Sequence, residues 1–159
     1  MNSPASAALT YQVAPSTHAR SADARAALLA GELGFGKHFT DHMVAIQWDQ
    51  VQGWHDAQVR AYGPLAMDPA AAVLHYGLEI FEGIKAYRHA DGSIWTFRPE
   101  ANGARLQRSA ERLTLPQLPV AEFVESLRQL IALDHAWVPS AAETSLYFRP
   151  FMIATEAYL

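Results

Sequence analysis

Apolar and polar residues follow two different periods along the chain, and the pattern predicts short strands that alternate with helices. The strand-like runs Met43–Trp48 and Gln58–Tyr62 are separated by a turn at Gly53, which predicts a hairpin. A second hairpin is predicted from Ile84–Arg88 and Ser93–Phe97, because an Asp-Gly pair lies in the turn between them.

Three helices are predicted after residue 35, outside the hairpins. Asp68-Pro69 is a helix start signal with Asp68 as the N-cap, so a helix is expected over Ala70–Phe81, with a stop at Gly83. A second helix is expected from Pro99 to about Leu113, and a third after Pro119. The third is amphipathic, because its apolar residues recur at helical spacing. These residues are Val120, Phe123, Val124, Leu127, Leu130 and Ile131.

Hairpins together with separate helices favour an α+β fold with a largely antiparallel sheet flanked by helices. Residues 35–159 are expected to form this domain, whose last element is the β-rich run Ser145–Ala154, interrupted by Pro150. Residues 1–34 are rich in Ala, Ser and Pro and are expected to be a mobile N-terminal arm, with a short helix over Ala22–Ala30. Because the sequence stops straight after a strand, we expect a piece of a longer protein.

Composition removes several classes of function. The 159 residues include 12 Lys plus Arg and 16 Asp plus Glu, for a formal charge of −4, so nucleic acid is not the expected partner. The absence of Cys excludes thiol catalysis, disulfides and Cys-based zinc sites. No run approaches the roughly 18 apolar residues of a membrane span. A cytoplasmic protein is expected, and a mitochondrial transit peptide in the acid-free first 22 residues is the alternative.

Common catalytic motifs are missing or incomplete. The glycines of residues 31–36 are in the wrong order for a dinucleotide loop and predict a flexible hinge. His38 and His42 are four residues apart, but the Glu of a zinc protease helix is absent, so structural histidines are expected. No Gly-x-Ser-x-Gly elbow supplies a serine nucleophile.

Two groups of residues carry candidate chemistry. Arg105, Arg108 and Arg112 share one face of the helix after Pro99, near Gly103, and form either a phosphate-binding fork or a solvated basic face. Tyr147 and Arg149 share one face of the last β-rich run. They could line a pocket for carboxylate-bearing substrates, or Arg149 could simply be half-buried, with its stem packed and its head in water.

Several blocks, in order along residues 35–159, together resemble the branched-chain amino acid aminotransferases, which are fold type IV pyridoxal-phosphate enzymes. The blocks are Phe35–Met43, Leu74–Tyr87, Phe97–Pro99 with Asn102 and Arg105, Arg108–Ala110, Trp137–Pro139 and Thr144–Pro150. The resemblance implies the small N-terminal domain of such an enzyme. It also implies that the larger C-terminal domain, which supplies the Schiff-base Lys, is absent from this chain.

The resemblance also assigns roles to individual residues. Arg105 is similar to the family's phosphate-binding Arg, and the cofactor it implies is pyridoxal 5'-phosphate. Six substrate-binding residues are implied: Phe35, Phe81 and Tyr147 as apolar walls, Tyr76 and Arg149 as polar groups for the side-chain carboxylate of glutamate, and Leu159 at the start of the interdomain loop. No catalytic residue is carried over, because Lys37 and Lys85, the two lysines of the chain, fall outside the family's Schiff-base segment.

The reaction implied is transfer of the amino group between Leu, Ile or Val and 2-oxoglutarate, in a homodimer. The implied partners are amino acids, 2-oxo acids, the missing C-terminal domain and a second subunit, without nucleic acid or membrane. This chain alone is expected to be inactive. The alternatives are a non-catalytic α+β binding or regulatory module, or part of another fold type IV enzyme such as a D-amino acid aminotransferase or an aminodeoxychorismate lyase.

Overall fold

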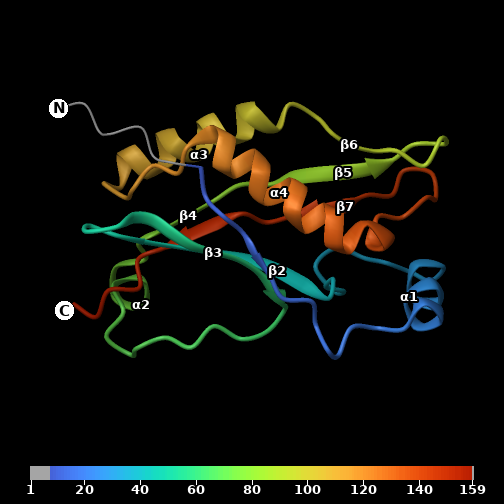
Figure 1. Ribbon diagram of the computed structural model, residues 1–159, viewed down its shortest axis with the longest axis horizontal. Coiled ribbons are helices and arrows are strands. Elements are labelled where there is room, and N and C mark those ends of the chain that lie inside the picture. The colour runs from blue at the N-terminus through green and yellow to red at the C-terminus, as the bar shows by residue number, and fades with distance from the viewer. Residues whose placement is uncertain (1–7, 159) are drawn as a thin grey trace.

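The computed structural model describes residues 8–158, in which helices pack against small, largely antiparallel sheets (Figure 1). The structure confirms the hairpins predicted from residues 43–62 and 84–97 and the helices predicted over residues 22–30, over residues 99–113 and after Pro119. Along the chain the elements are β1 (Gln12–Val13), α1 (Ala22–Leu29), β2 (His42–Asp49), β3 (Gly53–Ala61), α2 (Ala72–Tyr76), β4 (Glu79–Phe81), β5 (Ile84–Arg88), β6 (Ile94–Thr96), α3 (Pro99–Arg112), α4 (Val120–Asp134), the 3-10 helix η1 (His135–Trp137), β7 (Leu146–Phe148) and β8 (Phe151–Ile153).

Within residues 8–158 the strands form three small sheets. Strand β3 lies between β1 and β2, strand β5 lies between β6 and β7, and β4 pairs with β8. Every pairing is antiparallel except that of β1 with β3. The predicted largely antiparallel α+β fold is thus confirmed.

The pair of β4 with β8 and the pair of β5 with β7 lie end to end and form one long antiparallel ribbon, which is interrupted in the middle. Ile84 of β5 is opposite Phe148 of β7, and Phe81 of β4 is opposite Phe151 of β8. Pro150 has no N–H for the ladder, but its carbonyl accepts a hydrogen bond of 2.8 Å from the N–H of Glu82. The interruption lies beside Glu82 and, on the other strand, beside Arg149.

The helix expected over Ala70–Phe81 is wrong in its length. Helix α2 ends at Tyr76 because Gly77 adopts a left-handed conformation, with φ of 61°, and its N–H caps the helix by bonding to the carbonyl of Val73. The following residues pair with β8 instead of continuing the helix. Asp68 is not the N-cap either, since its carboxylate accepts the N–H of Ala70 in a turn before the helix.

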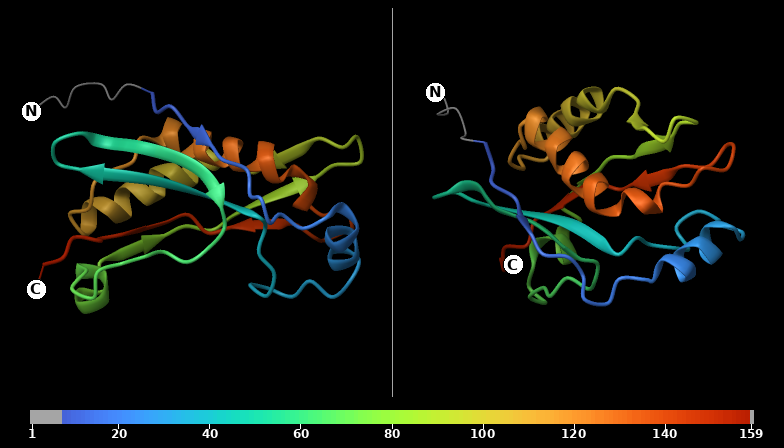
Figure 2. Two further views of the ribbon diagram at one scale, coloured as in Figure 1. Left: turned by 60° about the horizontal axis from the view of Figure 1, so that its bottom comes forward. Right: turned by 45° about the vertical axis from the view of Figure 1, so that its right-hand side comes forward.

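Helices α3 and α4 lie side by side and cover one face of the ribbon (Figures 1 and 2). Gly103 allows their close approach, because a Cβ at this position would lie 3.1 Å from the ring of Phe123. Gly103 therefore serves the packing of α3 against α4, a role that its position near Arg105 in the sequence did not predict. The buried apolar core between helices and strands consists of Ile80, Ile84, Ala86, Leu106, Ala110, Leu118, Phe123, Leu127 and Phe148.

The described part of the expected mobile arm, residues 8–34, packs along the domain. The N–H of Leu9 donates to the buried carboxylate of Glu122, and β1 pairs with β3. These contacts come from backbone groups, so the low-complexity composition gave no sign of them. Figure 2 shows this segment crossing beside the hairpin of β2 and β3.

His42 anchors the same segment and confirms the expectation of a structural histidine. Its Nε2 accepts the N–H of Ser16 at 2.8 Å, so Nδ1 carries the proton and donates to Asp134 at 2.6 Å. Both side chains of this pair are buried. No cluster of three potential metal-ligating side chains occurs within residues 8–158.

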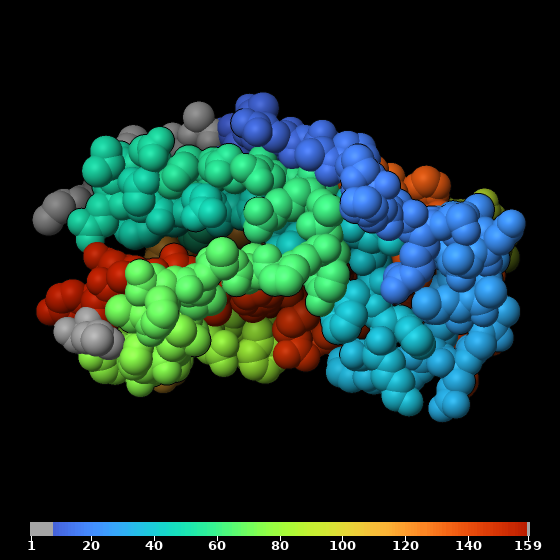
Figure 3. Space-filling model, turned by 90° about the horizontal axis from the view of Figure 1, so that it is seen from below, coloured from blue at the N-terminus to red at the C-terminus, as the bar shows by residue number. Residues whose placement is uncertain are grey.

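The side of the molecule away from α3 and α4 carries both a helix and irregular segments. Figure 3 shows α2, the segment that leads to it from β3, and the loop before β2 on this surface. No helix in the part of the chain described is long and apolar enough to cross a membrane.

Candidate functional site

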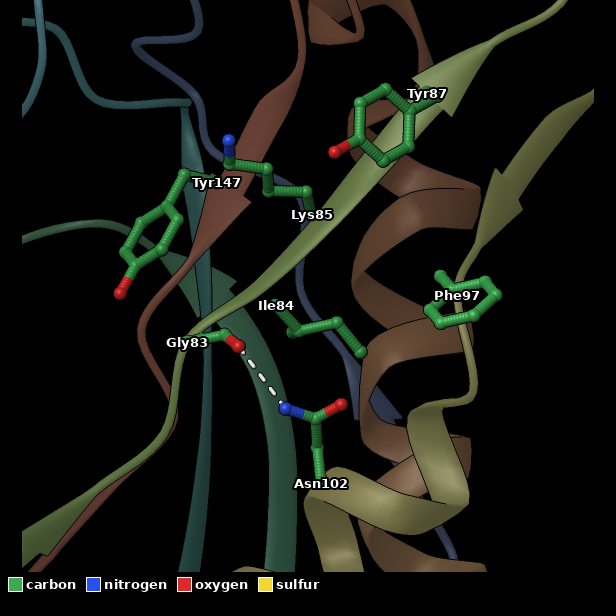
Figure 4. A pocket seen from close by; sticks show the side chains of 7 residues that line it. All are labelled: Gly83, Ile84, Lys85, Tyr87, Phe97, Asn102 and Tyr147. Carbon is green, nitrogen blue, oxygen red and sulfur yellow. Dashed lines mark hydrogen bonds between the residues drawn. The ribbon is translucent and has the colours of Figure 1, made fainter.

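A cavity of about 280 Å³ lies at the interruption of the ribbon, between β5 and the first turn of α3 (Figure 4). Asn102 of α3 closes one side of it and donates a hydrogen bond of 3.1 Å to the carbonyl of Gly83. Side chains from adjacent strands form the other side, where Lys85 is opposite Tyr147 in the ladder. The lining residues are Gly83, Ile84, Lys85, Tyr87, Phe97, Asn102 and Tyr147.

Glu82 is a buried carboxylate beside this cavity, and its side chain is 3% exposed. The guanidinium of Arg105 donates to it twice, through Nε and Nη2, each at 2.6 Å. Asn102 donates a third hydrogen bond to it, at 3.0 Å. Three donors therefore satisfy a charge that would otherwise be costly to bury.

The ionisation of Glu82 follows from these contacts. Burial acts to raise its pKa, but the hydrogen bonds from Arg105 and Asn102, together with the positive charge of Arg105, outweigh burial and hold the pKa below its usual value. The pKa of Arg105 is raised in turn by its hydrogen bonds to Glu82. Both groups are thus ionised at neutral pH.

Four of the predicted substrate-binding residues gather at one place beside the ribbon. The rings of Phe35 and Tyr147 meet edge to face, with centroids 5.0 Å apart. The guanidinium of Arg149 lies 4.4 Å from the ring centroid of Phe81, and its Nε donates to the hydroxyl of Tyr147 at 3.1 Å. We call Phe35, Phe81, Tyr147 and Arg149 the aromatic–arginine cluster.

The cluster combines an apolar surface with a positive charge. Phe35 and Phe81 are 71% and 59% exposed, so their rings are free to contact a ligand. Cation–π contacts to Phe81 and Tyr147 hold the guanidinium of Arg149 in place while leaving it exposed. Aliphatic groups and carboxylates can therefore both be accommodated beside these four residues.

Gly83 sets the position of Tyr147, although sequence reasoning gave it only the role of a helix stop. A Cβ at residue 83 would lie 2.5 Å from the Tyr147 hydroxyl oxygen and 3.1 Å from two ring carbons. Any side chain here would push the tyrosine ring away. Gly83 thereby links the cavity to the aromatic–arginine cluster.

The two other predicted substrate residues are not part of this cluster. Tyr76 lies on α2, is 59% exposed, and has its ring beside that of its neighbour His75. Leu159 lies outside the described residues. Of the other arginines of α3, Arg108 and Arg112 are exposed, and Arg105 alone among the three is paired with Glu82.

Sequence reasoning assigned no role to Glu82 or Asn102. A signal for Glu82 was available, since a charged residue between Ile80-Phe81 and Gly83-Ile84 stands in an otherwise apolar run and needs a buried partner. Its partner, 23 residues further along on another element, could not be read from the same pattern.

Curated proteins similar to this chain are branched-chain-amino-acid aminotransferases. A probable enzyme of this name from Streptomyces coelicolor is 58% identical over 151 residues, which are 94% of this chain and 41% of that protein. One from Mycolicibacterium smegmatis is 60% identical over 149 residues, or 93% and 40% of the two proteins. The chain spans about 40% of the length of these relatives. No protein-family model matches the chain.

Solved structures with a similar fold are also branched-chain aminotransferases. The branched-chain amino acid aminotransferase of Escherichia coli matches 60% of this chain and 30% of its own, with a TM-score of 0.50 and 26% identity. The branched-chain aminotransferase of Thermoproteus uzoniensis, solved with norvaline, matches 74% and 35%, with a TM-score of 0.55 and 21% identity. The resemblance predicted from the motifs is confirmed over the matched length.

Proposed function

We propose that this chain supplies the small domain of a pyridoxal-phosphate-dependent aminotransferase that exchanges the amino group between branched-chain amino acids and 2-oxoglutarate. The aromatic–arginine cluster is the observation that carries the proposal, because it offers apolar and cationic contacts in one place. The relatives from Streptomyces coelicolor and Mycolicibacterium smegmatis support it through their names and identity. In this proposal residues 35–159 are the domain and residues 1–34 precede it.

The cluster suits a reaction in which two unlike side chains take turns in one pocket. Phe35, Phe81 and Tyr147 would contact the aliphatic side chain of Leu, Ile or Val. Arg149 would pair with the second carboxylate of glutamate or 2-oxoglutarate. Because Arg149 stays exposed and stacked on Phe81, it does not become an unpaired buried charge when an aliphatic substrate is bound.

The donor set around Arg105 fits a phosphate group. Its guanidinium has five N–H donors, of which Glu82 occupies two, and its side chain is 59% exposed. Arg105 would hold the phosphate of pyridoxal 5'-phosphate through the remaining donors. The cofactor, when bound, supplies the electron sink for amino-group transfer. The residues of this chain bind the phosphate and orient the substrate.

The proposal leaves catalysis to residues outside this chain. Lys85 lies on a strand and lines the cavity, but neither it nor Lys37 is assigned as the covalent cofactor ligand. Tyr76 and Leu159 would complete the substrate pocket in a homodimer, where Tyr76 on its exposed helix would reach the partner subunit. The cytoplasm is the proposed location.

A hybrid protein tests the proposal. In it, this chain replaces the matching 41% of the Streptomyces coelicolor relative. The hybrid should convert leucine and 2-oxoglutarate to the 2-oxo acid and glutamate, measured by coupled detection of glutamate. A hybrid that folds and retains pyridoxal phosphate, yet transfers no amino group from leucine, isoleucine or valine, would contradict the proposed function.

A further inference from the structure

The ion pair of Glu82 with Arg105 differs from an ordinary surface ion pair, because one partner is buried and the other is exposed. Its carboxylate is buried at the junction of β4 and β5, while its partner Arg105 is 59% exposed on α3. Asn102 bonds both to this carboxylate and to the carbonyl of Gly83, so it fixes the carboxylate relative to the strand. The acid is the rigid member of the pair, and the arginine is the member that faces outward.

The geometry leaves a defined part of the guanidinium free. Glu82 receives Nε–H and one N–H of Nη2, and among residues 8–158 the side chain of Arg105 donates to no other group. Both N–H groups of Nη1 and the second of Nη2 remain. Because the guanidinium is planar and the contact is bidentate, fixing the Nε–Nη2 edge also fixes the direction of the adjacent Nη1–Nη2 edge.

We propose that Glu82, clamped by Asn102, is a positioning residue that presents the free edge of Arg105 to a phosphate group. This inference rests on the proposed function, in which that phosphate belongs to the cofactor. A long arginine side chain otherwise loses rotamer freedom when it binds an anion. Because Glu82 already holds the Arg105 side chain in one geometry, binding of the anion costs little further rotamer entropy.

A purely electrostatic view of the same ion pair makes the opposite prediction. If Glu82 only neutralises Arg105, replacing it with an uncharged residue leaves a stronger net positive charge, and phosphate binds more tightly. If Glu82 positions Arg105, the same replacement weakens phosphate binding. The sign of the change in affinity therefore separates the two roles.

The experiment is an NMR titration of the 159-residue chain, labelled with ¹⁵N-arginine, with inorganic phosphate against sodium chloride at matched ionic strength. Arg105→Lys identifies the Nε–H signal of Arg105. In the unchanged chain this signal should shift with phosphate. In Glu82→Gln and in Glu82→Asp, which keeps the charge but withdraws the carboxylate, the dissociation constant should rise roughly three- to tenfold.

Glu79→Gln is the matched control, because it removes the same charge from an exposed residue of β4, whereas the ion pair and hydrogen bonds of the Arg105 side chain within residues 8–158 are all to Glu82. Its dissociation constant should stay unchanged. If either Glu82 variant loses its folded amide spectrum, Asn102→Ala replaces it and should weaken binding in the same direction. Equal or tighter phosphate binding in the Glu82 variants, or no phosphate shift at Arg105 in the unchanged chain, overturns the inference. Neither outcome depends on transamination by the hybrid protein, so the two proposals fail separately.

Discussion

Replacing Arg149 with glutamine should change the substrate preference of the hybrid protein while leaving its fold intact. Arg149 is exposed and is restrained by the rings of Phe81 and Tyr147 and by its hydrogen bond to the Tyr147 hydroxyl. Glutamine can still bond to that hydroxyl but carries no charge. The substitution therefore removes the charge pairing that only a dicarboxylate substrate makes with this residue.

The size of the effect follows from the exposure of the guanidinium. A hydrogen bond to a charged group contributes about 1.5–3 kcal/mol. Water competes for an exposed arginine, so we take the lower end, and about 1.5 kcal/mol corresponds to about a tenfold change. We expect Arg149→Gln to lower kcat/KM for glutamate by roughly tenfold relative to leucine.

The assay compares kcat/KM for glutamate and leucine, each as the amino donor, in the unchanged hybrid protein and in the variant. Absorbance of the bound cofactor shows that the site is still loaded. Arg128→Gln on α4 is the control, because Arg128 is an exposed arginine whose ion pair in the described structure is with Glu125 on its own helix. Equal losses for both substrates would show that Arg149 supports the ribbon or a group common to both. A larger loss for leucine would refute the assignment of the pocket.

Four further outcomes can be measured. Arg105→Ala should weaken retention of pyridoxal phosphate by the hybrid protein far more than Arg108→Ala, as followed by cofactor absorbance after dialysis. Equal effects would show that the arginines of α3 form a solvated basic face and not a phosphate site. The 159-residue chain should not transaminate, and borohydride should trap no stoichiometric pyridoxal phosphate adduct by mass spectrometry, whereas an adduct on Lys85 would make it a Schiff-base lysine. Gly83→Ala should lower kcat/KM for leucine and glutamate alike while changing Tm little, because the displaced tyrosine ring can rotate toward solvent; unchanged kinetics would remove Gly83 from the site. The lowered pKa of Glu82 means that its ionised form stabilises the fold above its ordinary pKa of 4.5, and that this contribution is lost as pH falls through the lower pKa of the folded state. Urea unfolding of Glu82→Gln should therefore show a smaller loss of stability than the unchanged chain as pH is lowered from neutral to below 4.5, and identical pH profiles would contradict the reasoning.

The elements that sequence predicted correctly are those whose signals are local. Helix α3 begins at Pro99, and the amphipathic spacing of α4 is complete within its own 15 residues. The turn of β5 and β6 contains its own Asp-Gly pair. The predicted end of helix α2 was wrong, because the helix ends where Gly77 adopts a left-handed conformation and where β4 pairs with β8, which lies far along the chain. Pairing at that distance leaves no mark on local periodicity.

In the candidate site, too, the features that depend on local sequence could be predicted and those that depend on long-range contacts could not. Tyr147 and Arg149 could be placed together from strand alternation, and the structure brings them into contact. The sequence pattern could not distinguish Arg105 from the other two arginines, because Arg105, Arg108 and Arg112 share one face of the helix. What distinguishes Arg105 is the carboxylate of Glu82, which is buried at the junction of β4 and β5, where the ribbon is interrupted and Pro150 cannot continue the ladder. The same interruption leaves Glu82 facing α3 and lets Gly83 admit the ring of Tyr147, so one break in strand pairing positions both the proposed phosphate-binding arginine and the aromatic–arginine cluster.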